Sequence, residues 1–303
     1  MVEWKIKKPI IIALGVLAAL GVFIVALVVL IMNWSNILFY IHERKINNLP
    51  KIKSSPVEWD NIPITHFHVR TSHNSFIGSS IQVFSQSSSK SILNALKLGA
   101  RAIEIDVGLD NSGKCVVGHK GLRPGEFSTT TVSFESMLQL IADNAFKDVN
   151  DPLFICLDNT SDSGNRVLGE RMYEGITNIL GKYLHVYSKG LRETPLKELR
   201  NKIVILGTEN PYGPLNKITH SYENKGSLNE NALTMRTNWY MTRIWPQEWN
   251  SVLSHNFNAI PFMKNNNRMI AMNFGHYDSY LLTYLKQFGE HGLAPVPPEM
   301  VNY

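Results

Sequence analysis

Polar side chains of the kinds that bind cations and move protons interrupt or follow the short apolar runs of this sequence. Glu104 and Asp106 lie two residues apart in the alternating run 102–107, so on a strand both carboxylates point to the same face. His73 and Asn74 come a few residues after an earlier short apolar run. These residue types indicate metal binding and acid–base chemistry.

Two later apolar runs end in the same way. His119 follows the run 115–117 after one glycine, and Asp158 ends the run 153–157. Two histidines, three carboxylates and one asparagine predict a hard-cation site flanked by acid–base imidazoles, and oxygen ligands favour Ca²⁺ or Mg²⁺ over zinc. Taken singly, each group is more often a satisfied core residue or part of a structural ion pair. Their common position at the ends of runs favours a site.

Strands and helices must alternate to bring these groups together. Further short apolar runs cover residues 202–206 and 269–274, and helix-like segments cover residues 89–98, 133–145 and 164–180. This alternation predicts an α/β fold with a parallel sheet, and a domain of about 240 residues suits a single (β/α)8 TIM barrel. Catalytic groups of such barrels gather at the carboxyl ends of the strands, where these polar residues would lie.

The amino-terminal region carries the longest apolar run. Residues 9–32 contain no charged side chain and would reach ~36 Å as a helix, enough to cross ~30 Å of hydrocarbon. We therefore expect a tail at 1–8, a transmembrane helix at 9–32 and a stalk at 33–60, in a single-pass membrane protein. A cleaved signal peptide is the alternative, although its apolar core usually has only ~7–15 residues. The side of the membrane that the globular domain faces stays open.

Composition excludes several classes of protein. The chain has 303 residues, a formal net charge of +5 and only two cysteines, which excludes a cystine-stapled scaffold and a cysteine-based zinc cluster. Cys115 and Cys156, on strands expected to be neighbours, are predicted to be buried free thiols, with a disulfide as the alternative. The mild basic excess suits an anionic membrane surface and gives no indication of nucleic-acid binding. The polar stretch 216–231 predicts an exposed linker within the domain.

Six short motifs carry a resemblance to a known family. They are SHNSF at 72–76, LKLGARAIEID at 96–106, VGH at 117–119, LDN at 157–159, TRIWP at 242–246 and RMIAMNF at 268–274. In this order they resemble the catalytic domain of the eukaryotic phosphoinositide-specific phospholipases C. The X half would cover about 61–208 and the Y half about 232–300 of a domain at 61–303. The resemblance implies a distorted TIM barrel that acts on phosphoinositide membrane lipids, and it indicates no protein partner.

The resemblance also implies the catalytic and metal-binding roles. His73 would stabilise the pentacoordinate phosphorane, and His119 would protonate the departing diacylglycerol oxygen. The Ca²⁺ ligands would be Asn74, Glu104, Asp106 and Asp158. The ion would lower the pKa of the inositol 2-hydroxyl, whose proton Glu104 or Asp158 would accept.

Three further residues would contact the lipid. Arg243 would bind the inositol ring or its phosphate, Trp245 would stack on the ring, and Trp249 would lie on an apolar rim that enters the bilayer. The implied function is that of a membrane-anchored, Ca²⁺-dependent phospholipase C, which cleaves phosphatidylinositol lipids to diacylglycerol and inositol phosphates through a cyclic phosphate. The alternatives are a related barrel phosphodiesterase for another phospholipid or a glycerophosphodiester, and a catalytically silent lipid-binding barrel.

Three positions depart from the family pattern. Asp158 stands where the family usually has Glu, and Trp245 stands where it usually has Tyr. Residues 206–208 are Leu, Gly and Thr where the polyphosphoinositide enzymes carry two lysines. Because lysines bind the ring phosphates, we expect phosphatidylinositol or its monophosphate to be cleaved at least as well as the bisphosphate.

Overall fold

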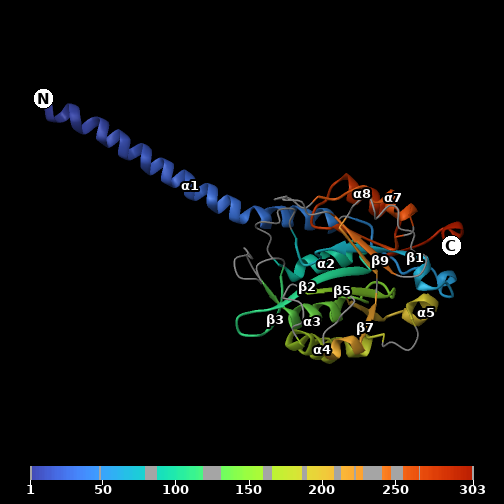
Figure 1. The fold of residues 1–303 in the computed structure, drawn as a ribbon. Coiled ribbons are helices and arrows are strands. Elements are labelled where there is room, and N and C mark those ends of the chain that lie inside the picture. Colours follow the sequence, from blue (N-terminus) through green and yellow to red (C-terminus); the bar gives the residue numbers. More distant parts are fainter. Residues whose placement is uncertain are drawn as a thin grey trace.

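The computed structural model describes most of the chain. It covers residues 2–47, 49–78, 87–118, 131–159, 166–185, 190–207, 213–221, 223–227, 241–246, 255–265 and 267–301. Helices surround a curled sheet, and a long amino-terminal helix projects away from this body (Figure 1).

The sheet has one continuous path of parallel strands. Their order is β7-β6-β5-β2-β1-β10-β9-β8. The strands of the path are β1 (Phe67–His73), β2 (Ala102–Leu109), β5 (Leu153–Asn159), β6 (Ile203–Gly207), β7 (Thr219–Ser221), β8 (Glu223–Ser227), β9 (Thr242–Trp245) and β10 (Met269–Asn273). Each neighbouring pair on the path is parallel. Off the path, β3 (Cys115–Val117) is antiparallel to β2, β4 (Val132–Ser133) to β3, and β11 (Leu293–Pro295) to β1.

The two ends of the path come from one stretch of chain. β7 ends at Ser221 and β8 begins at Glu223, yet β7 pairs with β6 and β8 pairs with β9. The sheet therefore curls until its two edges approach each other. The predicted exposed linker at 216–231 is thus wrong in part, since this stretch supplies two strands and buries His220. Backbone pairing with neighbouring strands overrides the polarity of its side chains.

The helices cover the outer face of the sheet. They are α2 (Ser89–Lys97), α3 (Phe134–Asn144), α4 (Arg166–Leu180), α5 (Leu196–Leu199), α7 (Ile260–Lys264) and α8 (Ser279–Lys286). Short 3-10 helices are η1 (Val57–Trp59), η2 (Ile64–His66), η3 (Gly181–Tyr183), η4 (Leu191–Glu193), η5 (Gly213–Lys217) and η6 (Pro298–Met300). Serine side chains cap two of the long helices: Ser88 accepts from the Lys90 amide, and Ser133 accepts from the Ser136 amide. Helices 89–98, 133–145 and 164–180 are therefore confirmed with small shifts at their ends.

The two-residue period of the strands decides which side chains enter the curled sheet. On β2, Ile103 and Ile105 belong to the large apolar core that includes the helices, whereas Ala102 belongs to a second cluster with Phe154 and Cys156 of β5. Glu104 lies on the same face of β2 as Ala102, since it is two residues further along. The inner face is therefore apolar near the amino ends of the strands and charged toward their carboxyl ends.

The two cysteines lie on different partners of β2. Cys115 on β3 pairs with Leu109, whereas Cys156 on β5 pairs with Glu104. Both are buried free thiols, as predicted, but they are not on neighbouring strands. Burial raises the pKa of the Cys156 thiol to about 12, so this group is inert at neutral pH.

The predicted transmembrane helix at 9–32, and with it the single-pass membrane location, is contradicted. Among the residues whose placement is described, no helix is long and apolar enough to cross a bilayer. The apolar run belongs to helix α1 (Val2–Asn47).

The predicted stalk at 33–60 also differs from the structure. Its first part continues helix α1 to Asn47, and Ile46 is buried in the main core. Its last part is fixed to the start of β5 by the buried carboxylate of Asp151, which accepts from the Ser55 amide at 3.0 Å and from the Ser55 hydroxyl at 2.9 Å. Arg200 donates to the same carboxylate at 2.5 Å. This segment is therefore part of the folded domain.

Replacing Asp151 with alanine should lower the free energy of unfolding by about 3 kcal/mol, because Arg200 and Ser55 lose a fully buried acceptor. Urea unfolding followed by fluorescence measures the change. Glu290→Ala is the control, since it removes an exposed ion pair with Lys53 and should change stability little. Equal losses in the two variants would contradict this assignment of Asp151.

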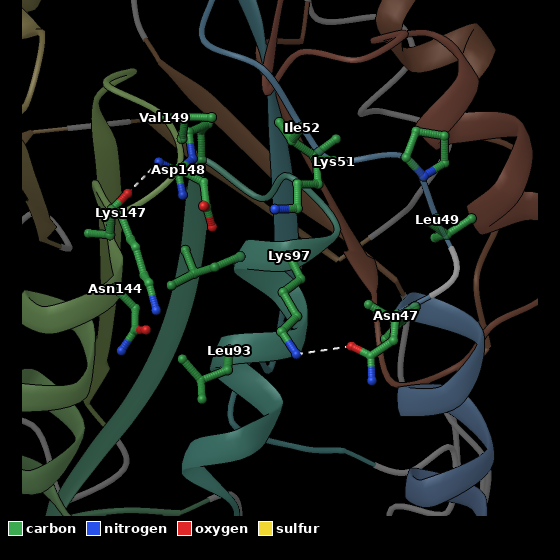
Figure 2. A pocket seen from close by; sticks show the side chains of 15 residues that line it. Asn47, Leu49, Lys51, Ile52, Leu93, Lys97, Asn144, Lys147, Asp148 and Val149 are labelled. Atoms are coloured by element: carbon green, nitrogen blue, oxygen red, sulfur yellow. Dashed lines mark hydrogen bonds between the residues drawn. The ribbon is translucent and has the colours of Figure 1, made fainter.

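A cavity of about 270 Å³ lies between the end of α1, helix α2 and the end of α3. Figure 2 shows the hydrogen bond from Lys97 to Asn47 beside it, 3.1 Å long. Arg101 and Val149, which also line it, precede β2 and β5 in the chain. The cavity therefore lies toward the amino ends of these strands, away from the charged inner face, and it is not the candidate active site.

Candidate active site

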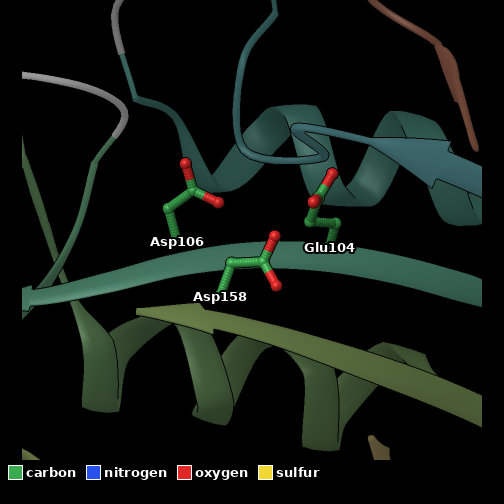
Figure 3. A group of neighbouring side chains, drawn as sticks. All are labelled: Glu104, Asp106 and Asp158. Carbon is green, nitrogen blue, oxygen red and sulfur yellow. The ribbon is translucent and has the colours of Figure 1, made fainter. Parts of the chain in front are cut away.

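Three carboxylates meet at the carboxyl ends of β2 and β5. Asp106 of β2 is in register with Asp158 of β5, and Glu104 lies two residues before Asp106 on the same face. One oxygen from each lies within 4.8 Å of the others. Figure 3 shows the three side chains on the same side of their strands. The predicted pairing of Glu104 with Asp106 and the predicted position of Asp158 thus come together in one cluster.

The turn after β1 brings Asn74 to this cluster. Asn74 has a φ of 44°, in the left-handed region that asparagine tolerates better than most residues. Its backbone N–H donates to Glu104 Oε2 at 2.9 Å. Ser75 fixes the turn from the other side, because its hydroxyl donates to the Ser72 carbonyl and accepts from the Glu104 amide, each at 3.0 Å. The sequence motif at 72–76 is therefore a tight turn attached to β2.

His73 is held in one tautomer by Asn273 of β10. The side-chain nitrogen of Asn273 donates to the His255 carbonyl at 2.9 Å, so its Oδ1 faces His73 Nδ1 at 2.8 Å and accepts a hydrogen bond from the N–H there. His73 Nε2 then faces Glu104 Oε2 at 3.5 Å. The imidazole thus presents Nε2 to the carboxylate cluster. Asn273 is a site residue that was not predicted, although it lies in the motif at 268–274.

Asn273→Ala should lower kcat/KM on a phosphoinositide by roughly 10–100-fold, because His73 loses the acceptor that fixes its tautomer. Asn273→Asp should restore orientation and move the pH profile of kcat/KM to higher pH, since a carboxylate favours the imidazolium. The measurement is kcat/KM from pH 5 to 9 for both variants. Asn144→Ala, at the end of α3, is the control. An unchanged rate and pH profile in Asn273→Ala would remove the positioning role.

Arg243 of β9 connects two of the carboxylates. Its guanidinium is completely buried and donates to Glu104 Oε1 at 2.5 Å and to Asp158 Oδ2 at 2.8 Å. Its central carbon lies 4.8 Å from the centre of the Trp245 ring, on which it stacks. The predicted substrate-binding pair is therefore at the site, but Arg243 is bound to the carboxylates.

The pKa values of the two carboxylates paired with Arg243 are shifted in opposite directions. Burial works to raise the pKa of Glu104, but Arg243 and His73 outweigh it and hold that pKa at about 2. Burial raises the pKa of Asp158 to about 6, and the Glu104 charge adds to this rise while Arg243 opposes it. Glu104 is therefore the carboxylate that stays ionised.

The cluster fits a hard cation. Asp158 Oδ1 is buried and has no hydrogen-bond partner within the described structure. An unpartnered carboxylate oxygen beside two further carboxylates is the donor chemistry that Ca²⁺ and Mg²⁺ take. Among the described residues, this is the one group of three or more such ligands that lie close enough to share an ion.

Of three further positions singled out in the sequence, the structure describes one. His119 and Trp249 lie outside the described residues. Leu206, where a lysine would mark a polyphosphoinositide enzyme, is fully buried in the inner apolar cluster with Cys156. No cationic side chain therefore extends from that position of β6.

Comparison with known proteins agrees with this geometry. The family model for the X domain of phosphatidylinositol-specific phospholipase C matches residues 60–209. The zebrafish (Danio rerio) 1-phosphatidylinositol 4,5-bisphosphate phosphodiesterase delta-3-A is 30% identical over 151 residues, which are 48% of this chain and 18% of that protein. The chain is homologous to the phosphoinositide-specific phospholipases C, a family of phosphoric diester hydrolases.

The phospholipase C relatives are much longer than the region they share with this chain. Human delta-4 phosphodiesterase is 30% identical over 149 residues, 48% of this chain and 18% of its own length. A mouse protein named inactive phospholipase C-like protein 2 is 29% identical over 148 residues, 47% of this chain and 12% of its own length. The chain thus spans less than a fifth of these curated relatives, which include a protein described as inactive.

Solved phospholipase C structures share the fold. The crystal structure of L. pealei PLC21 matches with a TM-score of 0.65 at 16% identity, over 82% of this chain and 40% of that one. A calcium-dependent phosphoinositol-specific phospholipase C from Pseudomonas sp. matches with a TM-score of 0.52 at 12% identity, over 80% of this chain and 97% of that one. Because both identities are low, these matches establish the curled parallel α/β fold alone.

Proposed function

We propose that this chain is a Ca²⁺-dependent phosphoinositide phospholipase C that releases diacylglycerol and inositol phosphates through a cyclic phosphate. The observation that carries the proposal is the convergence of His73, three carboxylates and Arg243 at one end of the curled sheet, in a chain homologous to this family. The curled sheet is proposed to be a distorted (β/α)8 barrel within residues 61–303, with its X half at about 61–208 and its Y half at about 232–300.

The proposed cation site consists of Glu104, Asp106, Asp158 and Asn74. The three carboxylates lie together, and the turn at Asn74 is attached to Glu104. Bound there, Ca²⁺ would supply positive charge that acidifies a hydroxyl and neutralises phosphate oxygens. The unpartnered Oδ1 of Asp158 supports this assignment.

The proposed chemical step uses groups of this chain to move two protons. The inositol 2-hydroxyl attacks phosphorus and gives its proton to Glu104 or Asp158, and the bond from phosphorus to the glycerol oxygen breaks. That oxygen takes a proton from His119, which leaves diacylglycerol and a cyclic inositol phosphate. Water then opens the ring to the inositol phosphate. Arg243, and His73 in its protonated form, supply positive charge where the phosphate oxygens become more negative.

Release of soluble inositol phosphates tests this proposal. The full chain is incubated with vesicles that contain labelled phosphatidylinositol, its monophosphate or its bisphosphate, with Ca²⁺ or with EGTA. We expect Ca²⁺-dependent release of a soluble inositol phosphate and formation of diacylglycerol. Release from phosphatidylcholine or a glycerophosphodiester instead would favour a related barrel phosphodiesterase.

A catalytically silent lipid-binding barrel is the second candidate, because one of the homologous proteins is described as inactive. Retention of His73 at hydrogen-bond distance from Asn273 argues for an active site, since a silent barrel needs no fixed tautomer. Vesicle binding without release of soluble phosphate from any phosphoinositide would favour the silent barrel.

Phosphatidylinositol or its monophosphate should be cleaved at least as fast as the bisphosphate. The reason is the absence of a lysine at 206–208, where Leu206 is part of the inner core. Thr208→Lys should shift the ratio of kcat/KM values toward the bisphosphate by roughly tenfold, as one charge-assisted phosphate contact allows. Leu206→Lys would bury an ammonium, so its thermal stability must be checked first.

A strong native preference for the bisphosphate that Thr208→Lys leaves unchanged would contradict this prediction. It would mean that other basic side chains bind the ring phosphates. Lys217→Gln, on η5 near the same edge of the sheet, is the variant that would then lose the preference.

A further inference from the structure

Arg243 is bound to the two carboxylates that the proposed cation also needs. Its guanidinium donates to Glu104 Oε1 and to Asp158 Oδ2, and none of its surface is exposed. Asp158 Oδ1 is left without a described partner, so the carboxylates are only partly satisfied. The same arginine is the group proposed to bind the anionic head of the lipid. The two roles would require two different positions of one side chain.

The charge balance of the site explains the position that Arg243 takes here. Three carboxylates lie together, two of them are paired with Arg243, and His73 lies 3.5 Å from Glu104. Buried carboxylates need a counter-ion, since an unpaired charge in the interior is strongly destabilising. A divalent cation among the same oxygens would satisfy that need and would repel the guanidinium.

The surroundings offer Arg243 a second position. Trp245 follows it by two residues on the same face of β9, closer to the carboxyl end of the strand, and its ring is only partly buried. The guanidinium already stacks on this ring, so it can turn toward the mouth of the site while it keeps its cation–π contact. At the mouth it would meet an anionic ligand.

We propose that Arg243 is an exchangeable counter-ion: it neutralises Glu104 and Asp158 in the metal-free protein, and cation binding releases it to bind the phosphate of the substrate. This inference rests on the proposed Ca²⁺ site. It makes cation binding and headgroup binding cooperative, because each ligand favours the state in which Arg243 has left the carboxylates. By linkage, the factor by which Ca²⁺ tightens headgroup binding equals the factor by which the headgroup tightens Ca²⁺ binding.

Calorimetric titration of the full chain tests the exchange without an activity assay. Ca²⁺ is titrated into wild type and Arg243→Gln, each with and without saturating myo-inositol 1-phosphate. Wild type should bind Ca²⁺ at least about fivefold more tightly when the inositol phosphate is present, the lower range of allosteric coupling. Arg243→Gln should bind Ca²⁺ alone about tenfold more tightly than wild type does, and the inositol phosphate should have no further effect.

Two further variants and one stability measurement extend the test of the Arg243 exchange. Arg243→Lys keeps the charge but cannot donate to both carboxylates in the same way, so its Ca²⁺ affinity should lie between the other two. Arg166→Gln removes an exposed arginine that pairs with Glu170 and should behave as wild type. If Arg243→Gln unfolds at low temperature in EGTA, Ca²⁺ should raise its Tm by more than it raises that of wild type, because the ion replaces the lost counter-ion.

The outcomes separate this inference from the proposed function. Wild type that binds Ca²⁺ while Arg243→Gln binds it no more tightly, or a wild type with no coupling between the two ligands, would overturn the exchange and leave the Ca²⁺ site in place. Absence of Ca²⁺ binding by both proteins would overturn the site itself, and the exchange with it.

Discussion

His73→Ala should lower the rate of phosphoinositide cleavage by roughly 10²–10⁴-fold, the usual effect of removing a positioned proton-transfer group or a group that stabilises a developing oxyanion. The structure gives this histidine a fixed role, because Asn273 holds Nδ1 and leaves Nε2 to face the carboxylates. His119→Ala should have an effect of the same size if it protonates the leaving oxygen. The measurement is kcat and KM on phosphatidylinositol vesicles.

His291→Ala is the matched control, because this half-buried histidine contacts the Lys53 carbonyl and the Trp59 ring and is not part of the carboxylate cluster. It should keep full activity. The thermal stability of His73→Ala should change little, since its ring makes one hydrogen bond and one longer contact to Glu104. A His73→Ala protein that is folded and nearly as active as wild type would show that the histidine is not catalytic.

Removal of Ca²⁺ with EGTA should abolish activity, and Ca²⁺ should restore it. Asp106→Asn should raise the Ca²⁺ concentration needed for half-maximal rate by roughly tenfold or more, because one anionic ligand is lost from a cluster of three. Activity titrated against free Ca²⁺ in a buffered series measures both effects.

The control for the metal prediction is Asp110→Asn. Asp110 lies four residues beyond Asp106, and its exposed carboxylate accepts bonds only within its own turn, from Ser112 and Lys114. This variant should keep the wild-type Ca²⁺ requirement. Full turnover in EGTA would refute a role for the cation and would leave Arg243 as the positive charge at the cluster.

Local patterns in the sequence were enough to predict the parts of the site that lie on single strands. Glu104 and Asp106 share a face because strands have a two-residue period, and Asp158 could be placed because an apolar run ends at it. Parallel strands then bring these ends together, as the register of Asp106 with Asp158 confirms.

Contacts between distant segments could not be predicted in this way. Asn273 lies 200 residues from His73, and Arg243 lies 139 residues from Glu104, so nothing in the local sequence indicates that they meet. The family resemblance predicted that Arg243 binds the inositol ring or its phosphate, and it gave no indication of a contact with the carboxylates. Its ion pairs with the carboxylates follow from the curvature of the sheet, which brings β9 to face β2.

Hydropathy misplaced the amino-terminal region and one polar stretch for a similar reason. It assigned residues 33–60 to a free stalk, whereas Ser55 is bound by Asp151, which lies 96 residues away. It assigned residues 216–231 to a linker, whereas backbone pairing with β6 and β9 makes them strands. In both cases the decisive partners lie outside the stretch whose hydropathy was considered.

Phosphorus NMR of the reaction tests the central claim most directly, because it identifies which phosphate bond is cleaved. The full chain is added to phosphatidylinositol micelles with Ca²⁺, and the spectrum is followed over time for wild type and His73→Ala. The account predicts that wild type converts the lipid resonance to that of a five-membered cyclic inositol phosphate and then to a phosphomonoester, while His73→Ala leaves the lipid unchanged. A spectrum in which the lipid stays intact with wild type, or becomes phosphatidic acid, would contradict it.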